Sequence, residues 1–501
     1  GRGGPEGAWR ADPGVLLEVI SHRSVTRFVT VLLLVVSGFM LVPLVWVLVD
    51  GEQGTAMAFL LPVVILVPVA LLVLKLVRVD YNEVTTRDGF LMVSLGWAGV
   101  SIFGALPFVL SGAIPSYADA LFETMSGFTT TGASILTDIE SVPRSLLFWR
   151  SLTHWLGGMG IIVLTVAIFP LLGIGGLQLI KAEAPGPRVD KLTPKVTETA
   201  KILWLTYVIL SVLETILLML GGMNLFDALT HTFGTMATGG FSPRNASVGA
   251  YDSAYIDAVI TVFMVLAGIN FVLYHRIVAR RVHSIVQDGE LRAYLSIFVV
   301  ASVVSGVVLA ERYGGFLQGL RYGSFQVASI LTTTGYATAD YTLWPYIAQI
   351  VLFALMFVGG SSGSTGGGIK VVRVVTMIKQ GWNEMRYLVY PRGVFAIRLS
   401  GERLRKDIVY AISGFVMLYF TILVFSTVVI AAADNDILTS LSTALATLGN
   451  IGPGFAGVGP TQNYAFFPDW LKLYLTFVMM LGRLEIYTVL VLFTGRYWRQ
   501  Q

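Results

Sequence analysis

Long apolar stretches recur from one end of the chain to the other, which is the pattern of a protein that crosses a membrane repeatedly. The first stretch, residues 28–49, carries no charged side chain. A signal peptide has a shorter apolar core, so we interpret this stretch as a permanent span. We predict ten crossings, at 28–49, 55–74, 89–110, 145–173, 202–222, 254–275, 293–310, an interrupted 342–380, 408–433 and 470–495.

The composition supports the same fold class. Apolar residues make up 55% of the chain and charged residues only 13%, whereas soluble proteins carry about 25% charged residues. The chain has no cysteine, which excludes disulfides, thiolate metal sites and thiol nucleophiles. Its five histidines have no metal-ligand spacing. We therefore predict an all-α polytopic membrane protein that is not an enzyme.

Basic residues indicate the orientation of the chain. Lys and Arg in short loops stay on the cytoplasmic side. With the N-terminus inside, the inner segments hold 27 of the 34 basic residues, and both termini are cytoplasmic. This distribution accounts for the net charge of +4 without a nucleic-acid partner. The longest inner segment, 369–407, is too short for a soluble domain, so any regulatory domain must be a separate chain.

Four outer segments share one design, a short apolar stretch followed by a loop rich in Thr and Gly. These loops read SGFTTTGAS (126–134), GTMATGGFS (234–242), ILTTTGYAT (330–338) and TLGNIGPGF (447–455). We align them on one glycine in each loop, namely Gly132, Gly239, Gly335 and Gly452. One such loop alone is an ordinary turn, but four between paired spans predict a fourfold repeat.

The membrane limits what these segments can be. A stretch of about twelve residues cannot cross about 30 Å of hydrocarbon, so it must enter and return. The carbonyls of the following loop are tolerated only against protein or a water-filled cavity. Four such loops around one axis would offer rings of carbonyls that replace the hydration shell of a monovalent cation. Glycine would let the backbone approach the ion.

Several charged and polar residues are candidates for roles outside the loops. Glu123, inside a short helix, is the best candidate among the acidic residues of the outer segments, and most of the others are interpreted as ordinary surface charge. Arg483 lies deep in a span and needs a partner, which we expect to be a backbone carbonyl or a carboxylate. An ion pair with Glu214 or Asp257 is the alternative. His154 and Asn270 are interpreted as hydrogen-bonding residues of helix packing.

The eighth crossing contains the sequence GGSSGSTGGG at 359–368, which opposes helix formation. A phosphate-binding loop is the alternative, but Ile369 and Val371 break its GxxxxGK[ST] spacing and no strand precedes it. We therefore predict an intramembrane loop below the four glycine loops.

At these motifs the sequence resembles the Trk, Ktr and HKT superfamily of potassium and sodium transporters, and within it the bacterial Trk-type potassium-uptake channel subunit. Further stretches carry the resemblance, namely WRSLTHWLGGMGIIVLTVAIFPLLGIGGLQL (149–179), KAEAPGPRVDKLTPKVTETAK (181–201), VGGSSGSTGGGIKVVR (358–373) and LGRLEIYTVL (481–490). The resemblance covers the chain from about residue 28. It implies four span–pore-helix–span units around one pore, after an extra N-terminal helix pair.

The resemblance also implies the residues of the pore. Potassium is expected at the backbone of Thr130, Thr131, Gly132, Thr238, Gly239, Thr333, Thr334, Gly335, Asn450, Ile451 and Gly452. Sodium-selective relatives have serine in place of the first glycine, so Gly132 favours potassium. The fourth loop departs from the Thr-Thr-Gly pattern, so we expect only approximate symmetry. The implied gate comprises Gly359, Gly360, Ser361, Ser362, Gly363, Ser364, Thr365, Gly366, Gly367, Gly368 and Arg483.

The resemblance further implies a homodimer in the bacterial inner membrane and a cytosolic nucleotide-binding regulatory ring (TrkA-like). The basic segment 370–406 is the expected ring contact, and plain positive-inside topology is its alternative. Potassium is the only expected ligand, without an organic cofactor. The predicted parts are 1–27 (cytoplasmic segment), 28–88 (helix pair), and the pore repeats 89–201, 202–292, 293–407 and 408–501.

Two functions agree with these features of the sequence. The first is a gated potassium-uptake channel driven by the membrane potential, which supplies about 2.3 kcal/mol per charge per 100 mV. The alternative is a secondary symporter that couples potassium to sodium or protons. Inverted repeats would favour the symporter, whereas all four units here have the same orientation.

Overall fold

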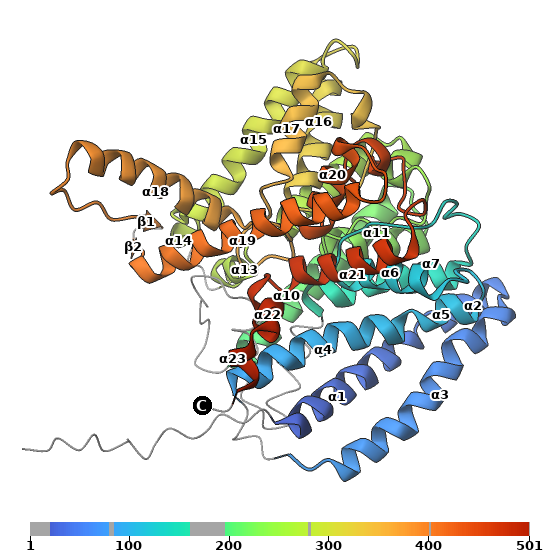
Figure 1. Cartoon of the computed structure of the whole chain (residues 1–501). Helices are drawn as coiled ribbons and strands as arrows, with labels where there is room; N and C mark the ends of the chain where they lie inside the picture. Colours follow the sequence, from blue (N-terminus) through green and yellow to red (C-terminus); the bar gives the residue numbers. More distant parts are fainter. Residues whose placement is uncertain (1–20, 80–84, 161–195, 279–281, 400–401, 500–501) are drawn as a thin grey trace, which may run out of the picture.

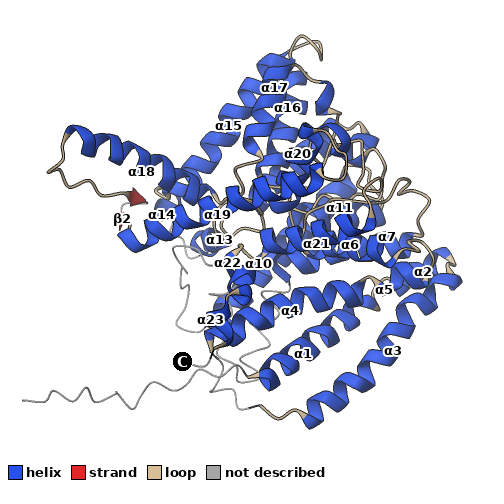
Figure 2. Cartoon of the chain, in the orientation of Figure 1, coloured by secondary structure: helices blue, strands red, loops and turns tan. Residues whose placement is uncertain are grey.

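The computed structural model describes residues 21–79, 85–160, 196–278, 282–399 and 402–499. The described chain is mostly helical, and its two short strands, β1 (Arg398–Leu399) and β2 (Glu402–Arg403), pair antiparallel (Figures 1 and 2). The sequence before residue 21 and the stretch 161–195 lie outside the described residues. The predicted cytoplasmic segment and the second half of the predicted crossing 145–173 therefore fall mainly outside them.

The N-terminal helices pack along one side of the molecule (Figure 1). They are α1 (His22–Met40), α2 (Leu44–Asp50) and α3 (Gln53–Leu76). Helix α1 contacts both α3 and α4. Helix α3 is apolar over its whole circumference and leaves Val64, Ile65 and Leu76 exposed. A helix of this length and composition suits lipid rather than water.

Four units follow, each with a helix, a short buried helix and a second helix. They are α4–α6–α7 (Thr86–Gly104, Tyr117–Phe128, Arg144–Trp155), α10–α11–α12 (Val196–Leu220, Leu225–Met236, Ala254–Ala267), α15–α16–α17 (Gly289–Leu309, Phe316–Leu331, Tyr346–Leu355) and α19–α20–α21 (Lys406–Ala431, Ile437–Leu448, Asp469–Arg483). Within every unit the short helix contacts both of its neighbours. The remaining helices and turns are α5 (Leu106–Leu110), α13 (Phe271–Val278), α14 (Val282–Val286), α18 (Val371–Val389), α22 (Tyr487–Leu490), α23 (Gly495–Trp498) and 3-10 turns at Ser247–Tyr251, Tyr341–Leu343, Ala456–Val458 and Val491–Phe493.

The second helix is interrupted in the second, third and fourth units, which the sequence predicts only for 342–380. Helix α7 passes into a π-helical turn at Leu156–Gly160, and α12 breaks before α13. The helix pair Asp469–Arg483 and Tyr487–Phe493 is bent by 112°. The continuous crossings predicted at 254–275 and 470–495 are therefore wrong. Six described helices are long and apolar enough to cross a membrane, or seven if the bent pair counts as one.

The short helices form the centre of the molecule because nearly every face of each is covered. Polar side chains cap their N-termini in three units: Ser116 before α6, Asn224 before α11 and Asp436 before α20. Large buried side chains, including Phe122, Phe128 and Tyr336, surround them. Burial on all sides fixes the positions at which these helices end.

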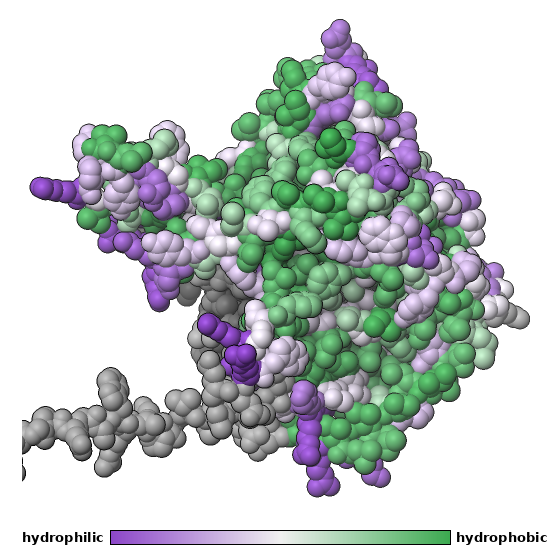
Figure 3. Space-filling view, in the orientation of Figure 1, coloured by the Kyte–Doolittle hydropathy of each residue, from purple (hydrophilic) through white to green (hydrophobic). Residues whose placement is uncertain are grey.

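The surface separates into apolar and polar zones (Figure 3). Apolar side chains cover the broad area over α3, α4 and the centre of the molecule, while hydrophilic residues gather at the upper-right margin and at the arm on the left. Helix α18 and the β1–β2 hairpin form this arm, which projects away from the rest of the chain (Figure 1). The apolar zone is consistent with a multi-pass membrane protein.

Candidate functional site: four ring loops and the glycine segment

The four short helices all end in the same backbone motif. In α6, the amide of Thr130 donates to the carbonyl of Gly127 at 3.0 Å, and that of Thr131 donates to Ser126 at 2.9 Å. This pair of hydrogen bonds defines a Schellman motif. Equivalent pairs follow α11, α16 and α20, at 2.7–3.3 Å. The backbone symmetry therefore extends to the fourth loop, although its sequence departs from Thr-Thr-Gly.

We call the three residues after the C-cap residue of each short helix the ring loops: Thr130–Thr131–Gly132, Thr238–Gly239–Gly240, Thr333–Thr334–Gly335 and Asn450–Ile451–Gly452. The first residue of each has a positive φ of 52°, 55°, 60° and 52°, and the glycine has a φ of 80°, 81°, 84° and 92°. The left-handed conformation of a threonine costs about 1–3 kcal/mol. Three of the four loops accept this strain, which marks a functional position.

The ring loops touch one another in a closed circle. A Cβ atom added at any of the four glycines would overlap or press against the carbonyl oxygen of a neighbouring loop. These contacts run from Gly132 to Gly239, from Gly240 to Thr334, from Gly335 to Ile451 and from Gly452 to Thr131. Because loop 4 returns to loop 1, the four loops surround a common axis. Only glycine fits at these contacts.

One cavity of about 160 Å³ opens directly onto this circle. All four ring glycines line it, together with residues of the outer segments such as Ser134, Asn245 and Tyr464. No carboxylate belongs to the described residues of its lining, whereas Arg150 and Arg244 do. The acidic residues of the outer segments therefore do not form the wall of this cavity.

The ring loops contain buried carbonyl groups without a protein partner. Among the described residues, no hydrogen bond is found to the carbonyl oxygens of seven ring-loop residues, namely Thr130, Thr131, Thr238, Thr333, Thr334, Asn450 and Ile451. These residues are buried. A buried backbone carbonyl without a partner is costly, so these seven carbonyls point to a partner that the described residues do not supply.

The alignment of loop 2 on Gly239 is wrong by one residue. Gly240, not Gly239, has the positive φ, abuts the next loop and lines the cavity, as Gly132 does in loop 1. Gly239 occupies the middle position and packs against the ring of His154. Because loop 2 has two glycines after its threonine, the sequence allowed either of them to be aligned with Gly132. Counting residues from the end of the short helix would have selected Gly240.

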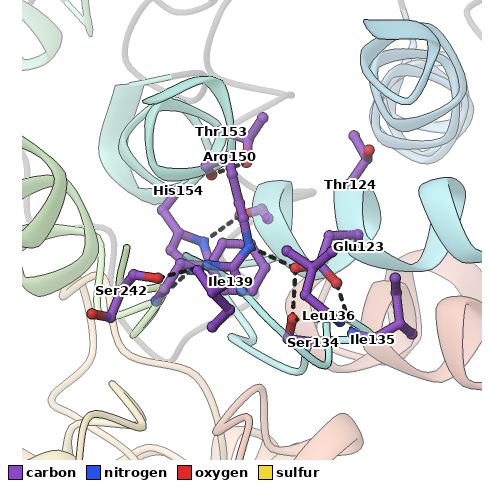
Figure 4. Close-up of polar contacts among 12 residues, drawn as sticks. Glu123, Thr124, Ser134, Ile135, Leu136, Ile139, Arg150, Thr153, His154 and Ser242 are labelled. Atoms are coloured by element: carbon purple, nitrogen blue, oxygen red, sulfur yellow. Dashed lines mark hydrogen bonds and ion pairs between the residues drawn. The ribbon is translucent and has the colours of Figure 1, made fainter. Parts of the chain in front are cut away.

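A buried ion pair supports the first ring loop (Figure 4). Arg150 of α7 donates through Nε to Glu123 Oε1 at 2.6 Å, and both side chains are almost fully buried. Glu123 also accepts from Ser134 Oγ and the amide of Ile135, each at 2.9 Å. Its carboxylate thus holds the chain just after Gly132. Glu123, the best acidic candidate from the sequence, is therefore a buried residue that supports the first ring loop through hydrogen bonds.

Arg150 and His154 connect the first loop to the second. Arg150 donates to the carbonyl of Ser242 at 3.0 Å, and its guanidinium lies 3.5 Å above the ring of Phe241. The amide of Phe241 donates to His154 Nε2, so Nδ1 carries the proton and donates to Gly127 at 2.7 Å. His154 of α7 therefore joins the last turn of α6 to the backbone just after loop 2. The bond to Gly127 of α6 is the helix-packing hydrogen bond predicted for His154, whereas the bond from Phe241 was not predicted, because sequence spacing does not show it.

Asp227 and Arg244 form a similar connection at the outer edge of loop 2. Arg244 donates to Asp227 Oδ2 at 2.9 Å. This hydrogen bond raises the pKa of Arg244 above its usual value. The positive charge of Arg244 beside the cavity is therefore permanent and partly neutralised by Asp227.

The glycine segment, residues 359–368, lies between α17 and α18 and against the ring loops. Its own backbone bonds are few. The amide of Gly359 donates to Ile369 at 2.8 Å, and the amide of Ser361 donates to Gly268 at the α12–α13 break. Asn270 abuts Gly363 and caps α13 through the amide of Val272, so it is not a helix-packing residue.

Side chains from other elements hold the glycine segment in place. Arg483 donates to Thr365 at 2.8 Å and to the carbonyls of Gly157 and Gly158 at 2.7 and 3.0 Å. A backbone carbonyl of the segment is thus one partner of Arg483, as predicted. The alternative ion pairs are wrong. Asp257 pairs with Arg321, and the Glu214 oxygens have no hydrogen-bond partner among the described residues.

Further charged residues surround the inner side of this segment. Glu290 accepts from the amide of Ser362 at 2.6 Å and from that of Val372 at 3.2 Å, so it fastens both ends. Lys370 donates to the carbonyl of Gly366, and Arg373 pairs with Glu485. Glu290 was not identified from the sequence, because nothing in its position distinguishes it from a helix-start carboxylate.

The fold and this geometry define the class of the protein: a polytopic helical membrane protein with four helix–short-helix–helix units around one axis. A family model described as TrkH, cation transport protein, matches residues 57–310 and 317–500. The chain belongs to this family. Its members are transport proteins rather than enzymes, as predicted from the sequence.

Individual relatives agree with this assignment. The chain is 41% identical over 489 residues to the Trk system potassium uptake protein TrkH of Halomonas elongata, covering 96% of this chain and 100% of the relative. The protein of the same name from Escherichia coli K12 is 38% identical over 95% of this chain and 99% of the relative. The crystal structure of the potassium transporter TrkH from Vibrio parahaemolyticus superimposes with a TM-score of 0.85, at 36% identity, over 95% and 99% of the two chains.

Proposed function

We propose that this protein carries potassium ions into the cell through the ring loops, which act as a backbone-carbonyl selectivity filter. The observation that carries the proposal is the closed circle of four loops with seven buried carbonyls that have no partner among the described residues. Carbonyl oxygens of this kind can replace the hydration shell of a potassium ion. The relatives named as potassium uptake proteins support the choice of ion.

The electrostatics of the helix ends support a cation. Helices α6, α11, α16 and α20 end immediately before the ring loops. Each contributes the negative end of its dipole, which favours a positive charge nearby. The arginines beside the cavity are paired with Glu123 and Asp227, so their repulsion of an entering cation is reduced.

We further propose that the glycine segment is the gate and that Arg483 holds it closed. The segment lies directly against the ring loops, so its position would block the pathway on the inner side. Its attachment by side chains of α15 and α21 would let movements of those helices release it. Glycines at φ of 73° and 64° (Gly363 and Gly368) provide backbone freedom for that movement.

The proposed setting is a bacterial inner membrane, with both termini in the cytoplasm and a homodimer as the assembly. A cytosolic nucleotide-binding ring would dock on the arm formed by α18 and the β hairpin. The arm exposes Trp382 and Leu388 beside Lys379 and Arg386. Exposed apolar residues next to basic ones suit an acidic protein partner with an apolar centre.

Replacement of the first ring glycine tests the filter. We expect Gly132→Ser to lower the preference for potassium over sodium, because the added side chain would push the Gly239 carbonyl out of place. The measurement is the flux of each ion into reconstituted vesicles. Unchanged selectivity would contradict the assignment. A flux that needs a sodium or proton gradient, rather than the potassium gradient alone, would favour the symporter.

Gly112→Ser is the matched control. Gly112 also has a positive φ, 76°, but no atom lies within 4 Å of an added Cβ. Its substitution introduces the same strained backbone without any contact to the ring loops. Selectivity should therefore stay at the parental value in this variant, and a change there would show that general destabilisation explains the Gly132 result.

A further inference from the structure

The glycine segment is hydrogen-bonded directly to one ring loop. The amide of Gly367 donates to Thr333 Oγ1 at 2.6 Å, and both residues are buried. A Cβ atom at Gly367 would lie 2.5 Å from the carbonyl oxygen of Gly449 and 2.9 Å from Asn450 Cβ. The segment therefore touches the third and fourth loops, and one side-chain hydroxyl joins it to the third.

Thr333 differs in this respect from the equivalent threonines. Thr238 donates its hydroxyl to the carbonyl of Ala237 at 2.6 Å, inside its own loop. Within the described chain, the Thr130 hydroxyl forms no hydrogen bond with the glycine segment. All three threonines share the left-handed backbone, so the orientation of each hydroxyl is set by the shape of its loop.

We propose that the Thr333 hydroxyl is a latch that links ion occupancy of the ring loops to the position of the glycine segment. A cation bound by the carbonyls of loop 3 would fix the backbone of Thr333 and align Oγ1 toward the Gly367 amide. Release of the segment would remove that bond and relax the same loop. Such a link is reciprocal, because ion binding must favour the closed segment as much as closure favours ion binding.

This inference rests on the proposed function and adds a regulatory residue to it. The latch is only one of several attachments, since Arg483 and Glu290 also hold the segment. Loss of one hydrogen bond changes an equilibrium by about two- to tenfold. We therefore expect removal of the hydroxyl to shift the segment partly toward release.

The chain has no cysteine, so a single introduced thiol reports on the segment without background. Ser362→Cys is suitable because the Ser362 side chain is partly exposed. The measurement is its modification rate by a membrane-impermeant thiol reagent, in vesicles containing potassium or sodium. We expect slower modification in potassium. Adding Thr333→Val should raise the rate about two- to tenfold in potassium and remove the difference between the ions.

Two variants make the result specific. Thr333→Ser keeps the hydroxyl and should retain the ion dependence, and Thr130→Val introduces the same branched side chain at an equivalent strained position without touching the segment. If Thr333→Val and Thr130→Val give the same rates and the same ion dependence, the latch is wrong. Should either valine variant fail to fold, the alanine pair at the same two positions gives the same comparison.

The proposed gate can fail separately from the latch. Arg483→Met in the Ser362→Cys background should speed modification in both ions if the segment moves when released. If Arg483→Met speeds modification but Thr333→Val behaves as Thr130→Val does, the proposed gate is supported and the latch is wrong. No change in the Arg483 variant overturns the gate and, with it, the latch.

Discussion

The ring loops and the glycine segment lie against each other, yet they are held in opposite ways. Each ring loop is closed by two backbone bonds to its own short helix, and in loops 1 and 2 the buried residues Glu123, Arg150 and His154 add support. The glycine segment has few bonds of its own and is fastened by Arg483, Glu290 and Thr333 from other elements.

The difference teaches which part can move at low cost. Opening a ring loop would unwind a helix end and expose a buried ion pair, which costs several kcal/mol. Releasing the glycine segment exchanges a few side-chain bonds for others, each worth about 0.5–1.5 kcal/mol when neutral. The attachment of the two regions thus agrees with the proposal of a permanent filter and a releasable gate.

The largest expected effect tests the permanence of the ring loops. We expect Arg150→Met to destabilise the protein by about 3–5 kcal/mol, because it leaves a buried carboxylate without its charged partner. Thermal unfolding in detergent, followed by size-exclusion chromatography, measures this loss. Arg405→Met is the control. It removes the exposed pair with Asp407 and should leave the unfolding temperature nearly unchanged. Equal effects of the two variants would contradict the structural role of Arg150.

An intermediate effect is expected at the gate. Arg483→Met should raise potassium flux in the absence of any activating partner by at least about tenfold, since each hydrogen bond from a charged donor contributes about 1.5–3 kcal/mol. The ratio of potassium to sodium flux should stay the same, because the ring loops are unaltered. Flux in reconstituted vesicles measures both quantities. A changed ion ratio with an unchanged rate would place Arg483 in the filter rather than the gate.

The smallest effect concerns a single pore-helix cap. Asp436 accepts from the amide of Thr439 at 3.2 Å at the start of α20, and hydrogen bonding from the Thr439 side chain and amide lowers the pKa of Asp436. Asp436→Ala should cost about 1 kcal/mol of stability, and Asp436→Asn, which can still cap, much less. The pKa of Asp436 is lower in the folded state than in the unfolded state. The stability that this cap contributes is therefore fully present above the unfolded-state pKa and is lost as pH falls through the folded-state pKa. Unfolding temperature against pH checks both points, and a contribution that grew with acidity would refute them.

The sequence predicted the repeat because its signal is local. Each ring loop follows a short apolar stretch, and the membrane permits few conformations for such a stretch. The glycine segment was predictable for the same reason, since six glycines in ten residues oppose a helix. The partner of Arg483 followed from the cost of a lone buried charge.

Contacts between distant residues escaped prediction. Nothing near Arg150 in the sequence shows that Glu123, 27 residues earlier, is its partner. Glu290 looks like an ordinary carboxylate in a first helical turn, although it holds a segment about 70 residues away. The register of loop 2 stayed ambiguous because both residues after Thr238 are glycines, and only backbone conformation separates them.

The circle of ring-loop contacts has a consequence for how the proposed pore can evolve. A pore built from identical subunits repeats every mutation four times, so small changes act together. Here one chain supplies all four quarters, and a single substitution alters one quarter alone. Each ring glycine nevertheless contacts the neighbouring loop, and a substitution at that glycine therefore also displaces the carbonyl of that loop. Mutations can therefore make the four loops chemically different while their common backbone geometry is preserved. Two such differences are already present: Asn450 stands where the other loops have threonine, and Gly239 stands where they have threonine or isoleucine.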